Sequence, residues 1–195
     1  RRELPRDPKE LAAWNGLVLS ALARAVAAGH ERYGEPAAAL ARRLAESFWD
    51  GREVHRARHG DDALGAASLG DYAYLARGLA DWARAGGEPT HRDTAARVVK
   101  AAWARHHRDG AWHLGGPAVI PGIPGEAALP DGPLPSPSAV LIGLTRDLAG
   151  HLADTDLPAR ARRLVRADPP AVGERPFAYP GHLGLLLRDG PTLGD

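Results

Sequence analysis

The sequence Trp14-Asn15-Gly16-Leu17 lies just inside the first segment with helical periodicity. Two later stretches, Asp71-Tyr72-Ala73-Tyr74 and Pro135-Ser136-Pro137-Ser138, hold a similar position at the start of helical segments of their own. The three stretches follow one another at intervals of roughly 60 residues, which indicates a repeated unit. We interpret each unit as a long inner helix, an outer helix and a loop.

The composition is typical of a globular domain and excludes several classes of function. The chain has 195 residues, 44% of them hydrophobic, and a formal net charge of +1. It contains no cysteine, so thiol catalysis, disulfides and thiolate metal sites are excluded within it. No apolar run approaches the roughly 20 residues that span a bilayer, and the near-zero charge gives no attraction toward nucleic acid or membranes. We expect a single domain over residues 1–195, in the cytoplasm, with no cofactor and no metal.

The spacing of apolar residues predicts six helices. The first starts at Asp7-Pro8-Lys9-Glu10, where Asp7 can cap, Pro8 suits the first helical position and Glu10 can complete a capping box, and it ends at Gly29. The others are expected from near Pro36, after Ser68, from about Thr90 to His106, after Ser136, and from about Leu157 to Ala167.

The segments between and after these helices carry their own signals. Arg52–His59 is predicted to be a short strand or hairpin arm, and Asp61–Ala67 a loop. Asp109-Gly110 predicts the tight turn of a small hairpin. Gly115–Pro137 holds seven prolines and five glycines, and a loop of this length is usually functional or disordered. A final apolar piece spans Leu183–Leu187.

The helices alternate in character along the chain. The first, third and fifth are apolar and poor in charge, whereas the second, fourth and sixth are amphipathic. This alternation is typical of an all-α fold of the α/α-toroid kind, in which outer helices surround inner ones. The repeat is longer than those of tetratricopeptide or HEAT arrays, which have roughly 34 to 47 residues. Such a chain forms about half of a six-hairpin ring, so we expect missing upstream sequence or a second subunit to cover its apolar edges.

Three motifs also resemble those of one protein family. Asp7-Pro8-Lys9 leading into Ala13-Trp14-Asn15-Gly16-Leu17 is similar to the "DDK…TAWNGLM" signature of the thioredoxin-domain-containing proteins related to the spermatogenesis-associated protein. Leu69-Gly70-Asp71-Tyr72-Ala73-Tyr74-Leu75 resembles that family's "LEDYAFL", and Asp131-Gly132-Pro133-Leu134-Pro135-Ser136 resembles its "DGATPSGNS". The motifs occur in the family's order and together span most of the chain.

The resemblance implies that the chain is the C-terminal portion of a longer protein. That family carries an N-terminal thioredoxin-like domain followed by a six-hairpin toroid similar to N-acylglucosamine 2-epimerases and several glycosidases. The implied partners are therefore an upstream toroid half and a thioredoxin-like domain, and fold analogy implies a sugar ligand. The chain departs from the family's pattern at Gly70, where an acidic residue is usual, and at Pro137-Ser138, where Gly-Asn is usual. These departures favour a non-catalytic scaffold.

Candidate site residues follow from the expected geometry of a toroid. Its inner helices run parallel, so their first turns meet at one mouth of the ring. Asp71 lies in such a turn and is the candidate general acid or base. The candidate substrate-binding residues belong to the first turns or to loops expected at the same rim, and they are Trp14, Asn15, Tyr72, Tyr74, His55, Trp112, His113 and Ser136. The aromatic ones offer flat faces for a sugar ring.

Several of these residues also have a structural interpretation. Asp71 stands three residues after a predicted N-cap serine, which is the spacing of a capping box and favours a helix cap. Trp14 lies on the apolar stripe and is more typical of the core than of a stacking platform. Asn15 is equally suited to bond a neighbouring loop. The His106-His107 pair is interpreted as the solvated end of its helix, where cations are favoured.

The residues leave more than one chemistry open. A glycosidase needs two carboxylates across a cleft, and Glu126 or Asp131 would join Asp71 there. An epimerase needs a base on each face of the sugar, with His55 or His113 as candidates. A prenyl-cyclase-type toroid is disfavoured because no Asp-rich diphosphate motif is present. Two hypotheses therefore stand: a sugar-active toroid segment, and a scaffold that packs against a thioredoxin-like domain or another partner.

Overall fold

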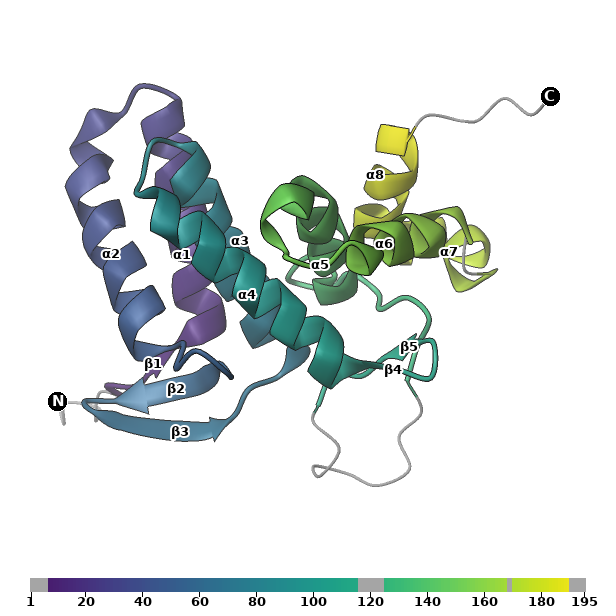
Figure 1. The fold of residues 1–195 in the computed structure, drawn as a ribbon, viewed down its shortest axis with the longest axis horizontal. Coiled ribbons are helices and arrows are strands. Elements are labelled where there is room, and N and C mark those ends of the chain that lie inside the picture. Colours follow the sequence, from purple (N-terminus) through teal and green to yellow (C-terminus); the bar gives the residue numbers. More distant parts are fainter. Residues whose placement is uncertain (1–6, 116–124, 168–169, 190–195) are drawn as a thin grey trace, which may run out of the picture.

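Three helical hairpins and a final helical group make up the structure (Figure 1). The computed structural model describes residues 7–115, 125–167 and 170–189. Within these residues it contains eight α-helices and two small antiparallel sheets, so the predicted mostly helical class is confirmed. Part of the predicted loop over 115–137 lies outside the described residues. Among the residues that the structure describes, no helix is long and apolar enough to cross a lipid bilayer.

The helices pair in the order in which they occur along the chain. The hairpins are α1 (Ala12–Ala27) with α2 (Gly34–Ser47), α3 (Leu69–Arg84) with α4 (Pro89–His106), and α5 (Pro137–Asp147) with α6 (Asp156–Arg166). The final group holds α7 (Pro170–Glu174) and α8 (Pro180–Asp189), and 3-10 turns cover Glu31–Tyr33, Ala149–His151 and Pro176–Ala178. The six predicted helices are present. The short α7 is not predicted by the apolar spacing, and α8 extends the predicted apolar piece in both directions.

Helices α1 and α3 touch backbone to backbone and run in the same direction. A Cβ atom added to Gly16 of α1 would lie 2.3 Å from the carbonyl oxygen of Tyr74 in α3. A Cβ atom added to Gly78 would lie 2.4 Å from the carbonyl oxygen of Gly16. Further along both helices, Ser20 Oγ donates a hydrogen bond to Asp81 Oδ2 at 2.5 Å. The crossing therefore requires glycine because any side chain would meet backbone atoms.

Helix α5 lies on the other side of α3 and also runs parallel to it. Near the start of α3, the Tyr74 hydroxyl donates a hydrogen bond to the carbonyl oxygen of Pro135, just before α5 begins. At the far ends of the two helices, Arg84 pairs with Asp147 at 3.5 Å. Figure 1 shows α5 on the side of α3 away from α2. Because the three helices run in the same direction, the first turns of α1, α3 and α5 lie at the same end of the helices.

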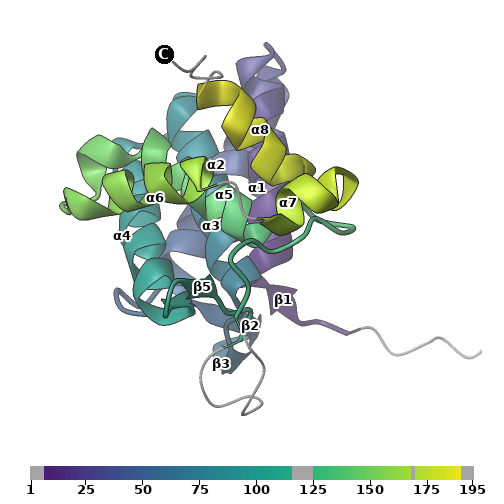
Figure 2. The same cartoon turned by 90° about the vertical axis from the view of Figure 1, so that its right-hand side faces the viewer.

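Helix α8 extends this row beyond α5. Ser138 Oγ of α5 lies 2.9 Å from His182 Nε2 of α8. Further along, a Cβ atom on Gly143 would lie 3.4 Å from a methyl carbon of Leu185. Because the paired positions rise together along both helices, α8 runs in the general direction of α5. The order of contacts is thus α1, α3, α5 and α8, and the relation of the last three can be followed in Figure 2.

Two small sheets flank the helices. The first contains β1 (Glu10–Leu11), β2 (His55–His59) and β3 (Asp62–Ala66) in that order, and the second contains β4 (His107–Arg108) and β5 (Ala111–Trp112). The strand predicted within 52–59 and the Asp109-Gly110 hairpin are confirmed. The loop predicted over 61–67 is wrong. A two-residue turn, in which Gly60 has a φ of 60°, instead closes a hairpin between β2 and β3.

The first helix begins later than its sequence predicts. Glu10 pairs with Arg58 of β2, so the chain is extended where a first helical turn is expected. Asp7 does not cap the helix, and its Oδ1 accepts a hydrogen bond from the backbone N–H of Lys9. Helix α1 starts at Ala12 without a side-chain cap. Strand pairing with a segment almost fifty residues away thus overrides a good local capping signal.

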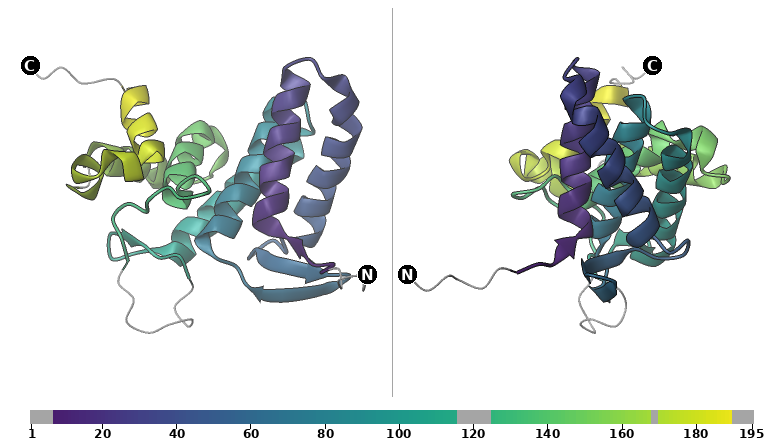
Figure 3. Two further views of the ribbon diagram at one scale, coloured as in Figure 1. Left: turned by 180° about the vertical axis from the view of Figure 1, so that it is seen from behind. Right: turned by 90° about the vertical axis from the view of Figure 1, so that its left-hand side faces the viewer.

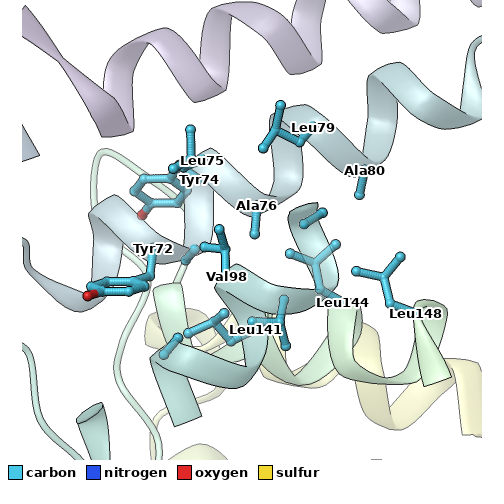
Figure 4. Packing of buried hydrophobic residues seen from close by; sticks show 14 of the residues in the cluster. Tyr72, Tyr74, Leu75, Ala76, Leu79, Ala80, Val98, Leu141, Leu144 and Leu148 are labelled. Atoms are coloured by element: carbon cyan, nitrogen blue, oxygen red, sulfur yellow. The ribbon is translucent and has the colours of Figure 1, made fainter. Parts of the chain in front are cut away.

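Helix α3 is the centre of the hydrophobic core. Of its 16 residues, 13 are buried, and helices α1, α4 and α5 all pack against it. Figure 4 shows part of this core, where Leu79 of α3 belongs to one cluster with Val98 of α4 and with Leu141 and Leu144 of α5. All four side chains are fully buried. The core therefore joins all three hairpins through α3.

Candidate functional site

Asp71 is held as a helix cap. Its Oδ2 accepts two hydrogen bonds from Ser68, one from the backbone N–H at 2.8 Å and one from the hydroxyl at 2.7 Å. The carboxylate is almost fully buried, with Asp71 5% exposed. The capping-box spacing is thus confirmed. These contacts explain the position of Asp71 by a structural role alone. Its role as a general acid or base stays a prediction.

Tyr72 faces the end of α4. Its hydroxyl accepts a hydrogen bond from the backbone N–H of Val54 at 3.2 Å. Its ring meets that of His106 edge to face, with centroids 5.3 Å apart. Burial raises the pKa of Tyr72, and only 2% of the residue is exposed. Tyr72 therefore presents no free face to a ligand in this structure.

Tyr74 faces the opposite way, toward the segment that precedes α5. Burial, together with the negative charges of Asp131 and Asp71, raises its pKa to about 12. The hydroxyl is consequently a proton donor at any ordinary pH, and it donates to the carbonyl oxygen of Pro135. Two of the three carboxylates that the sequence offers for acid–base chemistry, Asp71 and Asp131, thus act on one hydroxyl.

Asp131 anchors its loop to two helices. Its Oδ1 accepts a hydrogen bond from the backbone N–H of Ser136 at 3.0 Å, and its Oδ2 accepts one from that of Gly181 at 3.1 Å. It therefore ties the start of α5 to the start of α8. Glu126 lies elsewhere, in a backbone bridge with Trp112, and its side chain is exposed.

Trp14 and Asn15 occupy different environments on α1. Trp14 is 64% exposed, so its interpretation as a core residue is wrong. The stripe on which it lies faces away from α3 rather than toward it. Asn15 is half-buried, and its Nδ2 donates a hydrogen bond to the carbonyl oxygen of Leu11 at 2.9 Å. The amide thus bonds the chain just before its own helix.

The three predicted loop residues have different environments. His55 starts β2, and its Nε2 lies 3.8 Å from a carboxylate oxygen of Asp50. Trp112 is fully buried, and its ring packs against Trp103 at a centroid distance of 4.7 Å. It therefore has no free face for a sugar, contrary to expectation. His113 follows β5, and its backbone N–H donates to the carbonyl oxygen of His106 at 2.8 Å.

The His106-His107 pair is buried, so its interpretation as a solvated helix end is wrong. The two residues are 2% and 6% exposed; His106 ends α4, and His107 begins β4 and pairs with Trp112 of β5. His106 Nδ1 lies 3.0 Å from the carbonyl oxygen of His113, and His107 Nδ1 lies 2.6 Å from a guanidinium nitrogen of Arg160. The pKa of each is lowered to about 4, that of His106 mainly by burial and that of His107 by burial together with the positive charge of Arg160.

A buried serine–histidine cluster lies at the start of α5, and no sequence pattern indicates it. Ser136 caps α5 as predicted, because its Oγ accepts a hydrogen bond from the backbone N–H of Ala139 at 3.2 Å. The same hydroxyl donates to the carbonyl oxygen of Leu129 at 2.7 Å. Ser138 Oγ lies 3.0 Å from Ser136 Oγ and 2.9 Å from His182 Nε2. Burial lowers the pKa of His182.

This cluster is closed to solvent. Ser136 and Ser138 are fully buried, and His182 is 7% exposed. The Ser138 hydroxyl also accepts a hydrogen bond from the backbone N–H of Leu129 at 3.0 Å. The cluster therefore fastens the preceding loop to α5 and α8 instead of presenting a nucleophile.

A hollow of about 250 Å³ opens beside this cluster, between α3, α5 and α8. Ser136 is the one predicted site residue that lines it. Its charged lining residues are Arg77 of α3 and Arg188 of α8. Within the described ranges, no group of three or more histidine, aspartate or glutamate side chains could hold a metal ion.

Trp14 and Asn15 lie on α1, and the other seven candidate residues divide between two regions. One region, around the starts of α3 and α5, contains Asp71, Tyr74 and Ser136. The other, among β2, α4 and the β4–β5 hairpin, contains His55, Tyr72, Trp112 and His113. No model of a known protein family matches this chain, and a search of curated proteins finds no match either.

Proposed function

We propose that the chain is an arc of an α/α toroid with a scaffold function, in which the outer face of α1 docks a further αα hairpin. We define this outer face as Trp14, Val18, Ala21 and Ala25, which lie on the side of the helix opposite its contact with α3. Trp14 is 64% exposed and Val18 is 50% exposed. This exposed apolar stripe is the observation that carries the proposal.

The order of helices explains what would fit there. Helix α3 has an inner neighbour on each side, α1 and α5, and α5 likewise lies between α3 and α8. Among the described helices, α1 has an inner neighbour, α3, on one side only, which can be followed in the view from behind (Figure 3). A further inner helix against Trp14 and Val18 would continue the same row. The upstream toroid half that the motif resemblance implies, with its thioredoxin-like domain, is the occupant we favour over a second subunit.

The composition of α1 supports this assignment. A helix at the surface of a globular protein normally carries polar residues on its solvent side. Helix α1 contains a single charged residue, Arg24, near its end. Its partner α2 shows the usual pattern, with Arg42 and Glu46 exposed and Leu44 buried. Of the two helices in this hairpin, α1 therefore has the composition of an inner helix.

Tryptophan fluorescence offers a direct test. Trp14 is 64% exposed, while the other four tryptophans are at most 7% exposed. Acrylamide quenching therefore reports mainly on Trp14. We expect strong quenching in the 195-residue chain at low concentration and much weaker quenching in the intact polypeptide isolated from its source cells. A Trp14→Phe variant, which removes the accessible emitter, is the control.

The outcomes separate the occupants. Protection of Trp14 in a longer native polypeptide supports the upstream hairpin. Protection of Trp14 that grows with the concentration of the 195-residue chain would assign the face to a second copy. Sedimentation should then show self-association of the chain, and Trp14→Phe should weaken that self-association. Equal quenching in the native polypeptide and in the dilute chain would contradict the docking proposal.

A carbohydrate-related role is the second candidate. It is supported by the two carboxylates, Asp71 and Asp131, that raise the pKa of Tyr74, since a glycosidase uses a pair of carboxylates. In an intact toroid, saturating N-acetylglucosamine should then shift the NMR signals of Asp71 and Tyr74. Unshifted signals at saturation would count against this role and leave the scaffold proposal unaffected.

A further inference from the structure

The hollow between α3, α5 and α8 combines apolar walls with positive charge. Its volume is about 250 Å³, and its walls include Ala139 and Val140 of α5 and Leu185 of α8. The charged residues of its lining are two arginines, Arg77 from the middle of α3 and Arg188 from the last turn of α8. Among the residues that the structure describes, no acidic side chain lines it. Pockets of this kind, apolar with a few convergent polar groups, are typical of small-molecule sites.

We propose that this hollow binds a small organic carboxylate with an apolar body, whose carboxylate is held by Arg77 and Arg188. This site is independent of the scaffold role of α1. Guanidinium groups recognise planar carboxylates through paired N–H donors, which favours an organic acid. The apolar walls favour a hydrocarbon body over a sugar.

Both arginines have donors to offer. Arg77 is tied by its Nε, which donates to Asp81 Oδ2 at 2.9 Å, and this bond fixes the side chain beside α5. Its two terminal nitrogens have no partner among the described residues. Arg188 is exposed and makes no hydrogen bond or ion pair within the same ranges.

Glycines keep the hollow open. Gly184 of α8 lines it, and a Cβ atom added there would meet no atom within 4 Å. A side chain at Gly184 would therefore extend into the empty space. Gly143 lies opposite on α5, where a Cβ atom would lie 3.4 Å from Leu185. The helices thus carry two residues that lower helix propensity at the place where bulk would fill the site.

The nearby acidic groups are already engaged. Asp81 accepts hydrogen bonds from Ser20, Arg77 and Arg84 behind the wall. Asp131 uses both oxygens for the backbone N–H groups of Ser136 and Gly181. Neither carboxylate is part of the lining, so an anion inside the hollow faces the two guanidinium groups.

The test is an NMR titration of the 195-residue chain with benzoate. Benzylamine has a similar ring with the opposite charge, benzyl alcohol has no charge, and inorganic phosphate has charge without a ring. We expect benzoate alone to shift the amide signals of Gly143, Gly184 and Leu185 in a saturable way. Sodium glucuronate, a carboxylate with a polar body, is expected to bind at least about tenfold more weakly.

Two variants and a matched control locate the site. Arg188→Gln removes an exposed charge and should weaken benzoate binding about tenfold, the effect of losing one charged hydrogen bond. Gly184→Leu should abolish binding by filling the hollow while preserving the fold, because leucine favours helix. Arg166→Gln removes an exposed arginine from the last turn of α6, away from the hollow, and should leave binding unchanged.

The results decide the matter in each case. Benzylamine or phosphate binding as tightly as benzoate would overturn the proposal, because charge and body would not both contribute. A benzoate affinity that is unchanged in Gly184→Leu would also overturn the proposal. An equal loss of affinity in Arg166→Gln and Arg188→Gln would overturn it too. Absence of saturable benzoate shifts in the wild-type chain would overturn it as well. Tighter binding of glucuronate than of benzoate would assign the hollow to a polar acid and reject the apolar body.

Discussion

Helices α1 and α3 are equal in length and lie side by side, yet the more charged of the two is the more buried. Each has 16 residues. Helix α3 contains four charged residues and buries 13 positions, whereas α1 contains one charged residue and buries five. The difference reflects neighbours rather than composition, because α3 is covered by α1, α4 and α5. Helix α1, which is apolar and exposed on one side, is therefore the helix at which we propose that a partner hairpin binds.

The charges of α3 are buried only where they are paired. Asp81 is 6% exposed and lies between two arginines of its own helix, with Arg77 Nε at 2.9 Å and Arg84 at 3.0 Å. It also accepts a hydrogen bond from Ser20 of α1. A buried carboxylate with this many donors is compatible with a core helix. A charged residue can therefore be buried in a helix when its partners lie beside it, and the four charges of α3 do not prevent its burial.

The comparison is tested most strongly by removing one tryptophan from each helix. Trp82 of α3 is 7% exposed and belongs to the main core, so Trp82→Ala should lower the free energy of unfolding by about 3–5 kcal/mol. Trp14→Ala in α1 should change that of the monomer by less than about 0.5 kcal/mol. Urea denaturation of dilute protein measures both. Similar losses from the two variants would show that α1 is already covered in this chain.

Acid should lower the stability of the chain through two buried histidines, His106 and His107, at the end of the α3–α4 hairpin. The pKa values of His106 and His107 are about 4 in the folded chain and near 6.5 when unfolded, so between these values the unfolded chain binds more protons. Stability is therefore complete above about pH 6.5 and falls as the pH drops toward 4. The slope should approach ~1.4 kcal/mol per pH unit for each histidine. His182, whose pKa burial also lowers, acts in the same direction.

Denaturant titrations across pH 4 to 7 would measure this slope. His106→Asn keeps a donor near the carbonyl oxygen of His113 and should make the dependence shallower. His59→Asn, at an exposed strand end, is the control and should leave it unchanged. A pH-independent stability in the wild-type chain would show that the two buried rings are not the titrating groups.

The contact between the two helices is the next target. Gly16→Ala places a Cβ atom 2.3 Å from the carbonyl oxygen of Tyr74, so α1 and α3 must separate. We expect a loss of about 2 kcal/mol, even though alanine favours helix. Gly34→Ala, at the start of α2 where a Cβ atom meets nothing within 4 Å, should be neutral or slightly stabilising. Equal stability of the two variants would contradict the close crossing.

The sequence predicts the local features well. Periodicity places the six helices, and capping chemistry identifies Ser68 with Asp71 and Ser136 as helix starts. The Asp109-Gly110 turn is also recognisable, because its two positive φ angles suit these residue types. Each of these signals depends on residues a few positions apart, which is why a single sequence suffices.

The errors concern contacts between distant segments. The pairing of Glu10 with Arg58 replaces a first helical turn, and the hairpin β4–β5 buries His106 and His107 where a helix end is expected to be solvated. Ser138 and His182 meet across 44 residues without any spacing rule. Which side of α1 faces solvent is also decided by a distant segment, because α3 covers one side and leaves Trp14 exposed on the other. Nothing local to these residues encodes their partners.

The last variant, Asp71→Asn, separates a cap from a catalyst. Asn retains an oxygen that accepts from Ser68 but loses the charge at the positive end of α3, so the free energy of unfolding should fall by about 1 kcal/mol. Asn15→Ala, which removes the side-chain hydrogen bond at the start of α1, is the matched variant and should cost about 0.5 kcal/mol. Thermal unfolding measures both. If the intact protein instead lost an activity with Asp71→Asn while its melting temperature stayed the same, Asp71 would be a reacting group, and the scaffold proposal would no longer account for this end of α3.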